Sequence, residues 1–133
     1  MKFSLVALFT FLFGACQPVS DGMTVIPVDE FAQFITQSEV QLLDVRTPEE
    51  FEAGHIADAV MIDYRTDPEG FVQKAEAQLK KGRPVALYCR SGKRSHDAAE
   101  LLHKAGFQQL VELKGGILAW QEAGKEVKTD KSN

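Results

Sequence analysis

The feature that most constrains the fold is a regular alternation of short apolar runs with segments of helical periodicity. The apolar runs that read as strands are residues 23–28, 40–45, 59–64, 84–88 and 108–113. The segments with apolar residues at helical spacing are residues 28–37, 46–54, 67–82, 95–106 and 115–124. Strands that alternate with helices form βαβ units. The alternation therefore predicts an α/β fold with a central, mainly parallel five-stranded sheet and helices on both faces.

Length and composition allow one such domain. The chain has 133 residues, of which 44% are hydrophobic and 26% charged, as is ordinary for a globular protein. Its formal net charge of −4 disfavours nonspecific binding to nucleic acid, and we expect no nucleic-acid partner. Any anion site must therefore be a local concentration of positive charge within an acidic whole.

The beginning of the chain differs in character from the rest. Lys2 is the only charged residue within residues 1–15, and an apolar run over residues 3–13 is followed by two small residues. This order is typical of a secretory signal peptide, and the run is short for a membrane-spanning helix. We expect residues 1–15 to be a signal peptide that is removed before Cys16.

The residues around Cys16 resemble the cleavage box of bacterial lipoproteins, in which a cysteine after two small residues becomes the lipidated N-terminus. Phe13 departs from this pattern, since leucine is more usual there. The resemblance implies an exported protein, lipid-anchored in the bacterial envelope and facing the periplasm, because each buried acyl methylene contributes about 0.8 kcal/mol. Residues 16–23 would then be a tether. Release as a soluble secreted protein is the alternative.

Only one cysteine is then left for chemistry. Cys16 and Cys89 are the two cysteines of the chain, so lipidation of the first leaves Cys89 without an intrachain partner. An unpaired cysteine in an exported protein indicates a reactive thiol. Cys89 directly follows the apolar run 84–88, and parallel α/β sheets bind ligands beyond the carboxyl ends of their strands. The predicted fold thus places Cys89 at the binding edge of the sheet.

A basic loop leads from this cysteine into the next helix. Its candidate substrate-binding residues are Arg90, Ser91, Gly92, Lys93, Arg94 and Ser95. Gly92 lets successive backbone N–H groups turn inward, and we expect Ser95 to cap the helix. Three cations beside a helix N-terminus favour anions, and positive charge near a thiol stabilises the thiolate, which is the nucleophile. An inert, buried structural cysteine is the alternative.

Three motifs of this chain resemble the single-domain rhodanese family of sulfurtransferases. They are LLDVRTPEEFEAGHIADAVMID (residues 42–63), CRSGKRS (89–95) and LKGGILAW (113–120), in the family's order. The resemblance covers residues 24–124 and implies the rhodanese-like three-layer fold, with residues 125–133 as a polar tail. Asp58 departs from the family pattern, which has glycine there, and we expect this to alter a turn.

The resemblance implies a catalytic role for Cys89. Rhodaneses take sulfane sulfur from a donor such as thiosulfate, hold it as a cysteine persulfide and pass it to cyanide or a thiol. The resemblance implies no metal or organic cofactor. The partners expected are a small anionic donor, a thiophilic acceptor that can also be a protein, and the membrane through the lipid anchor. We expect the protein to be a monomer.

Four residues, Asp44, Arg46, Glu50 and His55, are expected to support the cysteine loop from the scaffold. The resemblance places Asp44 and Arg46 in ionic contacts that fix the loops, and it places His55 in the scaffold. Thr47 and Glu50 stand at the spacing of a helix capping box, with a proline at the first helical position. We expect these residues to hold the site rather than to take part in chemistry.

The spacing between Cys89 and Arg94 separates sulfur chemistry from phosphate chemistry. Four residues intervene, which is C-x4-R, whereas cysteine-dependent phosphatases and some arsenate reductases use C-x5-R. A tetrahedral oxyanion needs a wider cradle than a single sulfur atom. The spacing favours a sulfurtransferase, and a phosphatase or arsenate reductase remains an alternative. A rhodanese-like binding or sensing module without turnover is another.

Overall fold

The computed structural model describes residues 22–129. Its strands are β1 (Met23–Ile26), β2 (Gln41–Asp44), β3 (Val60–Met61), β4 (Val85–Tyr88) and β5 (Leu110–Leu113). Its helices are α1 (Val28–Phe34), α2 (Pro48–Ala53), α3 (Pro68–Gln78), α4 (Lys93–Lys104) and α5 (Gly116–Glu122). The strands form one sheet in the order β1-β5-β4-β2-β3, with every ladder parallel. The predicted α/β fold with a five-stranded parallel sheet is confirmed. The expectations for the signal peptide, for Cys16 and for most of the tether fall outside the described residues.

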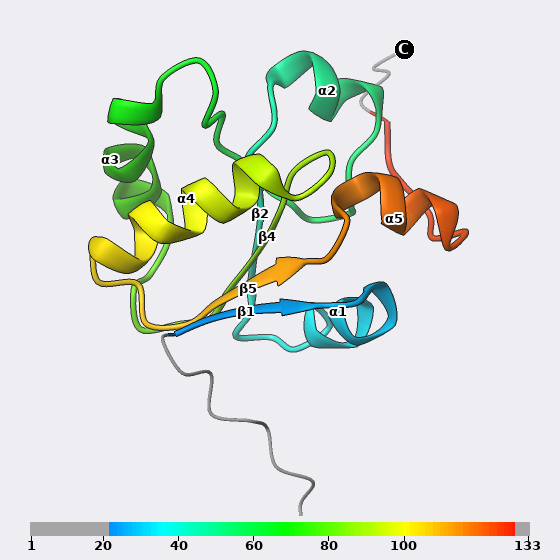
Figure 1. Ribbon diagram of the computed structural model, residues 1–133, viewed down its shortest axis with the longest axis horizontal. Coiled ribbons are helices and arrows are strands. Elements are labelled where there is room, and N and C mark those ends of the chain that lie inside the picture. Colours follow the sequence, from blue (N-terminus) through cyan, green and yellow to red (C-terminus); the bar gives the residue numbers. More distant parts are fainter. Residues whose placement is uncertain (1–21, 130–133) are drawn as a thin grey trace, which may run out of the picture.

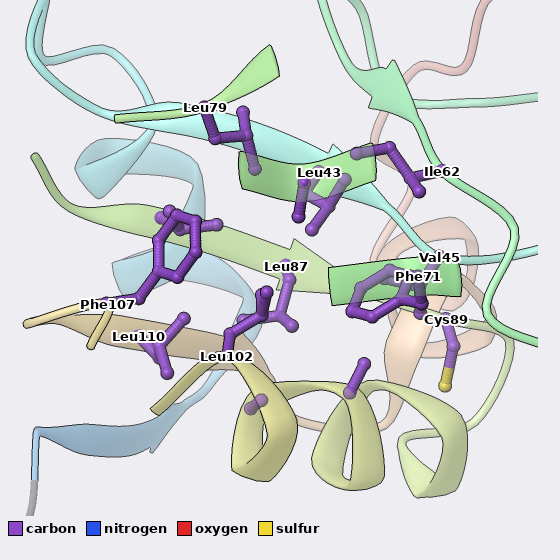
Figure 2. Close-up of a cluster of buried hydrophobic side chains, with 14 residues drawn as sticks. Leu43, Val45, Ile62, Phe71, Leu79, Leu87, Cys89, Leu102, Phe107 and Leu110 are labelled. Carbon is purple, nitrogen blue, oxygen red and sulfur yellow. The ribbon is translucent and has the colours of Figure 1, made fainter. Parts of the chain in front are cut away.

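Helices cover both faces of the sheet, which gives three layers (Figure 1). A first buried cluster joins the sheet to α3 and α4, and Figure 2 shows it. A second cluster joins the opposite face to α1 and α5. Successive strand residues point to opposite faces, so Leu87 packs in the first cluster and Tyr88 in the second. All four residues of β4 are buried because this strand lies in the middle of the sheet.

Local sequence signals correctly predict where α2 begins, but not where α4 begins. Thr47 caps α2 through a capping box: Glu50 N–H donates to Thr47 Oγ1 (3.3 Å) and Thr47 N–H to Glu50 Oε1 (3.4 Å), as predicted. The prediction that Ser95 caps α4 is wrong. Gly92 is the N-cap, with φ of 119°, and the helix begins at Lys93. Because glycine adopts this conformation readily, the chain turns into the helix three residues earlier than a cap at Ser95 would require.

One element is much shorter than its apolar run. The run over residues 59–64 predicted a full strand, whereas β3 has two residues. β3 is an edge strand, so only one neighbour holds it in the ladder. No helix within the described range is long and apolar enough to cross a membrane.

Candidate active site

Cys89 follows β4 at the carboxyl edge of the sheet, and two polar groups face its sulfur. Gly92 N–H donates a hydrogen bond to Cys89 Sγ (3.0 Å), and Ser95 Oγ lies 3.5 Å from the same atom. The Ser95 hydroxyl also donates to Gly92 O (3.0 Å), which closes the loop on itself. Only 1% of the Cys89 surface is exposed. Burial of this degree is typical of an inert structural thiol. The Gly92 N–H group aimed at the sulfur stabilises a thiolate, however, and a thiol packed only among apolar groups has no such donor.

The first turn of α5 packs against the backbone of the cysteine loop. Ile117 N–H donates to Cys89 O (2.9 Å), and Leu118 N–H donates to Arg90 O (3.2 Å). Gly116 makes this approach possible: a Cβ there would lie 2.6 Å from Cys89 O and closer still to Arg90 O, and its φ is +64°. The motif around Gly116 therefore acts by letting one backbone segment press against another.

We expect Gly116→Ala to destabilise the protein and to slow any reaction at Cys89. The added methyl group collides with the backbone of the cysteine loop, and such overpacking costs about 1–3 kcal/mol. Gly124→Ala is the matched control, because Gly124 has a similar φ of +76° but nothing within 4 Å of the added Cβ. Urea unfolding of both variants measures the difference. Equal destabilisation would mean that the positive φ, rather than contact with the loop, is what requires glycine at position 116.

The cations of the loop have different partners. Arg94 forms a two-pronged ion pair with Glu50 of α2, with Nη1–Oε1 of 2.7 Å and Nη2–Oε2 of 2.9 Å. The hydrogen bonds from Arg94 lower the pKa of Glu50 to about 2. Lys93 extends into solvent with its side chain 87% exposed, 3.7 Å from Asp97. Arg90 is also exposed. The Arg94 guanidinium is thus bound to the scaffold, whereas Arg90 and Lys93 lie open to an arriving anion.

The Glu50–Arg94 pair should make stability depend on pH in acid. The pKa of Glu50 is lowered in the folded protein, so the stabilisation is full above about pH 4.5 and is lost as pH falls toward 2. We expect Glu50→Gln to cost about 1–2 kcal/mol at pH 6, and about half of that at pH 3. Urea unfolding of both proteins at the two pH values measures this, because the other carboxylates cancel in the difference. A cost that stays constant with pH would contradict it.

Asp44 and Arg46 form the buried ion pair expected near the site. Arg46 Nη2 lies 2.8 Å from Asp44 Oδ2, and the Arg46 guanidinium also donates to Gly54 O (2.7 Å), at the end of α2. The Asp44 side chain is 0% exposed and the Arg46 side chain is 6% exposed. The pair ties the end of β2 to the far end of the helix that presents Glu50. It supports the cysteine loop through α2 and does not contact the sulfur.

His55 and Tyr88 complete this scaffold. The His55 ring is stacked on Phe51, with ring centroids 3.7 Å apart, and its Nδ1 lies 2.9 Å from Phe51 O. Tyr88 Oη accepts a hydrogen bond from Ile56 N–H (3.0 Å), and burial raises the pKa of Tyr88. His55 thus packs against the end of α2, and its support role stays a prediction.

Sequence reasoning missed a pair beside the loop that joins a buried glutamate to a half-exposed histidine. Glu112 of β5 is 3% exposed, and His96 Nδ1 in the first turn of α4 lies 3.2 Å from its Oε2. Burial raises the pKa of Glu112, and the hydrogen bond to Glu112 raises the pKa of His96. The signal that could have indicated this pair is Glu112 itself, a charged residue inside the apolar run 108–113. Among residues 22–129, no three His, Cys, Asp or Glu side chains come together as metal ligands would.

Comparisons with known proteins agree with this geometry. A family model described as a rhodanese-like domain matches residues 27–123. A sulfurtransferase of Allochromatium vinosum is 35% identical over 100 residues, which cover 74% of this chain and 89% of the relative. The protein YqhL of Bacillus subtilis is 38% identical over 93 residues, covering 70% of this chain and 68% of the relative. The crystal structure of a rhodanese-related protein from Thermoplasma volcanium matches with a TM-score of 0.68 and 29% identity, over 80% of this chain and 99% of that one.

Proposed function

The chain belongs to the rhodanese-like domain family of sulfurtransferases, and we propose that it moves sulfane sulfur from a small anionic donor such as thiosulfate through a persulfide on Cys89. The observation that carries this proposal is the hydrogen bond from Gly92 N–H to Cys89 Sγ within a basic loop. A thiolate needs such donors, and a persulfide anion at the same place needs them as well.

In the first step the Cys89 thiolate attacks the outer sulfur of thiosulfate. A new S–S bond forms between the two sulfurs, the S–S bond of thiosulfate breaks, and its electron pair leaves with sulfite. The charge is conserved, because the thiolate becomes a persulfide anion and the dianion becomes another dianion. The Gly92 N–H group and the cations Arg90 and Lys93 support a negative charge at the loop throughout.

In the second step an acceptor takes the outer sulfur. Cyanide or a thiolate attacks it, the persulfide S–S bond breaks, and the electron pair returns to Cys89 as thiolate. The products are thiocyanate or the acceptor's persulfide. Every bond is made and broken at sulfur, so the proposed cycle uses no metal or organic cofactor, and it should give ping-pong kinetics.

Mass spectrometry of the protein after incubation with thiosulfate tests the proposal. We expect a gain of about 32 daltons, one sulfur atom, that maps to Cys89 and disappears on addition of cyanide. Hydrolysis of an aryl phosphate in the same protein, lost in Cys89→Ser, would instead support the phosphatase alternative, which the four-residue spacing to Arg94 disfavours. Absence of the mass gain with thiosulfate and with other sulfane donors would leave a binding or sensing module.

We further propose export and lipid anchoring through Cys16, on the support of the sequence alone. The apolar run over residues 3–13 and the small residues before Cys16 provide that support. The mature protein would face the periplasm as a monomer, held to the membrane by acyl chains. The mass of the N-terminal peptide of protein extracted from membranes tests this, because an acylated Cys16 is heavier by the acyl chains.

A further inference from the structure

An exposed leucine lies beside the cysteine loop. Three large apolar side chains of the described residues are exposed: Val25, Val60 and Leu118. Val25 and Val60 belong to the two edge strands, β1 and β3. Leu118 belongs to α5, is 42% exposed and is bound through its N–H to Arg90 O (3.2 Å). Its position, rather than its exposure alone, sets it apart, since scattered surface leucines are common.

Lys114 lies at the same edge of the sheet as Cys89. It follows β5, and its N–H donates to Ile26 O (2.9 Å), so it continues the ladder with β1. Leu87 of β4 pairs with Glu112 of β5, and two residues further along these neighbouring strands come Cys89 and Lys114. Continued past the ends of both strands, this register brings Cys89 and Lys114 to neighbouring positions at the carboxyl edge of the sheet.

The cations around this point are largely free of carboxylate partners. Within the described part of the chain, Arg90 and Lys114 form no ion pair, and Lys93 has only a 3.7 Å contact with Asp97 at the surface. All three are exposed. We call the surface formed by Arg90, Lys93, Lys114 and Leu118 the loop rim. It is cationic in a chain whose net charge is −4.

We propose that the loop rim binds an acidic segment of a protein that accepts sulfur on a cysteine thiol. This inference rests on the proposed function and names the acceptor class for it. A small inorganic anion gains nothing from Leu118, whereas a polypeptide segment can cover an apolar side chain and pair with surrounding cations at once. Opposite charges also raise the rate of association, and salt screens this effect.

The transfer step fits a thiol on such a segment. The outer sulfur of the persulfide stands about 2.05 Å from Cys89 Sγ. The acceptor thiolate has to reach this outer atom and not the sulfur of Cys89, which is only 1% exposed. The acceptor thiolate attacks this outer sulfur, its new S–S bond forms, and the persulfide bond breaks to return the electron pair to Cys89. The acceptor leaves as a persulfide anion, and no oxidant or reductant is consumed.

Two synthetic peptides test the proposal on the full chain. Both carry one cysteine and one phenylalanine; the acidic peptide has glutamates where the other has glutamines. The protein is loaded with thiosulfate, and transfer of sulfur to each peptide is followed by mass spectrometry. We expect the acidic peptide to react about tenfold faster at about 20 mM salt, and the difference to shrink at about 200 mM.

Variants of two rim residues outside the proposed catalytic machinery locate the effect. We expect Lys114→Glu and Leu118→Ala each to slow transfer to the acidic peptide by about fivefold, while discharge by cyanide stays within about twofold. Lys80→Glu and Val60→Ala are the matched controls, since both residues are exposed away from the cysteine loop. Equal rates for the two peptides, or equal slowing of peptide and cyanide reactions, would overturn the docking proposal.

A failure of the proposed function gives a different result. In that case thiosulfate and other sulfane donors add no mass to Cys89, and no transfer is seen with cyanide either. Docking is then measured directly, by fluorescence anisotropy of the labelled acidic peptide with the unloaded protein. Binding that weakens in Lys114→Glu and Leu118→Ala but not in Lys80→Glu supports the loop rim, and binding equal in all four proteins refutes it.

Discussion

Cys89→Ser is expected to lower the rate of thiocyanate formation from thiosulfate and cyanide by about a thousandfold or more. A serine hydroxyl stays protonated near neutral pH and forms no S–S bond, so the covalent intermediate is lost. Serine is close to cysteine in shape, and its oxygen can accept the hydrogen bond that Gly92 N–H now gives to Cys89 Sγ. We therefore expect the fold to remain intact and the loss to be chemical.

Two measurements separate this outcome from unfolding and from other chemistry. The urea midpoint of Cys89→Ser should stay close to that of the unsubstituted protein, and the mass gain with thiosulfate should be absent. Ser91→Ala is a useful companion variant, because Ser91 is an exposed loop residue for which no contact with the sulfur is seen. Turnover that survives in Cys89→Ser would rule out the persulfide mechanism on this residue.

Arg46→Ala is expected to be the most destabilising of the single substitutions considered, by about 3–5 kcal/mol. It leaves the Asp44 carboxylate fully buried without its charged partner, although the hydrogen bond from Arg46 N–H (2.9 Å) is kept. It also removes the donor to Gly54 O at the end of α2. The expected loss is a large part of the total stability of a domain this size. Urea unfolding near neutral pH measures it.

A double variant and a surface pair provide the controls for this prediction. Replacing both buried partners, as Asp44→Leu with Arg46→Met, should cost less than Arg46→Ala alone, because no unpaired charge stays buried. Lys74→Ala removes an exposed ion pair to Asp67 and should cost at most about 1 kcal/mol. A double variant less stable than Arg46→Ala would mean that the fold requires the Asp44–Arg46 ion pair itself, and that removing both buried charges does not replace it.

Loss of the Asp44–Arg46 pair should reach the cysteine loop through α2. Arg46 binds Gly54 at the end of this helix, and Glu50 of the same helix holds Arg94. The buried Asp44–Arg46 pair and the half-buried Glu50–Arg94 pair thus both attach the short helix α2 to the rest of the domain. A short helix with no buried residue of its own depends on such polar attachments for its position.

Much of the fold and the place of Cys89 in it followed from local sequence signals. The alternation of apolar runs and helical segments predicted the parallel sheet, and the spacing of Thr47 and Glu50 predicted the capping box. Cys89 stood at the end of an apolar run, which placed it at the carboxyl edge of the sheet. These inferences succeed because each depends on neighbours within a few residues or on the general geometry of βαβ units.

Local sequence signals therefore account for the type of fold and for the loop that carries Cys89. Tertiary packing determines which side chains meet: Arg94 pairs with Glu50, 44 positions away, and the first turn of α5 packs against the backbone of the cysteine loop. It also decided that Gly92 rather than Ser95 begins α4, and that Glu112 is buried against His96. The physical reason is that local periodicity sets each element, whereas long-range contacts depend on how the elements pack, and a single charge pattern is compatible with several partners.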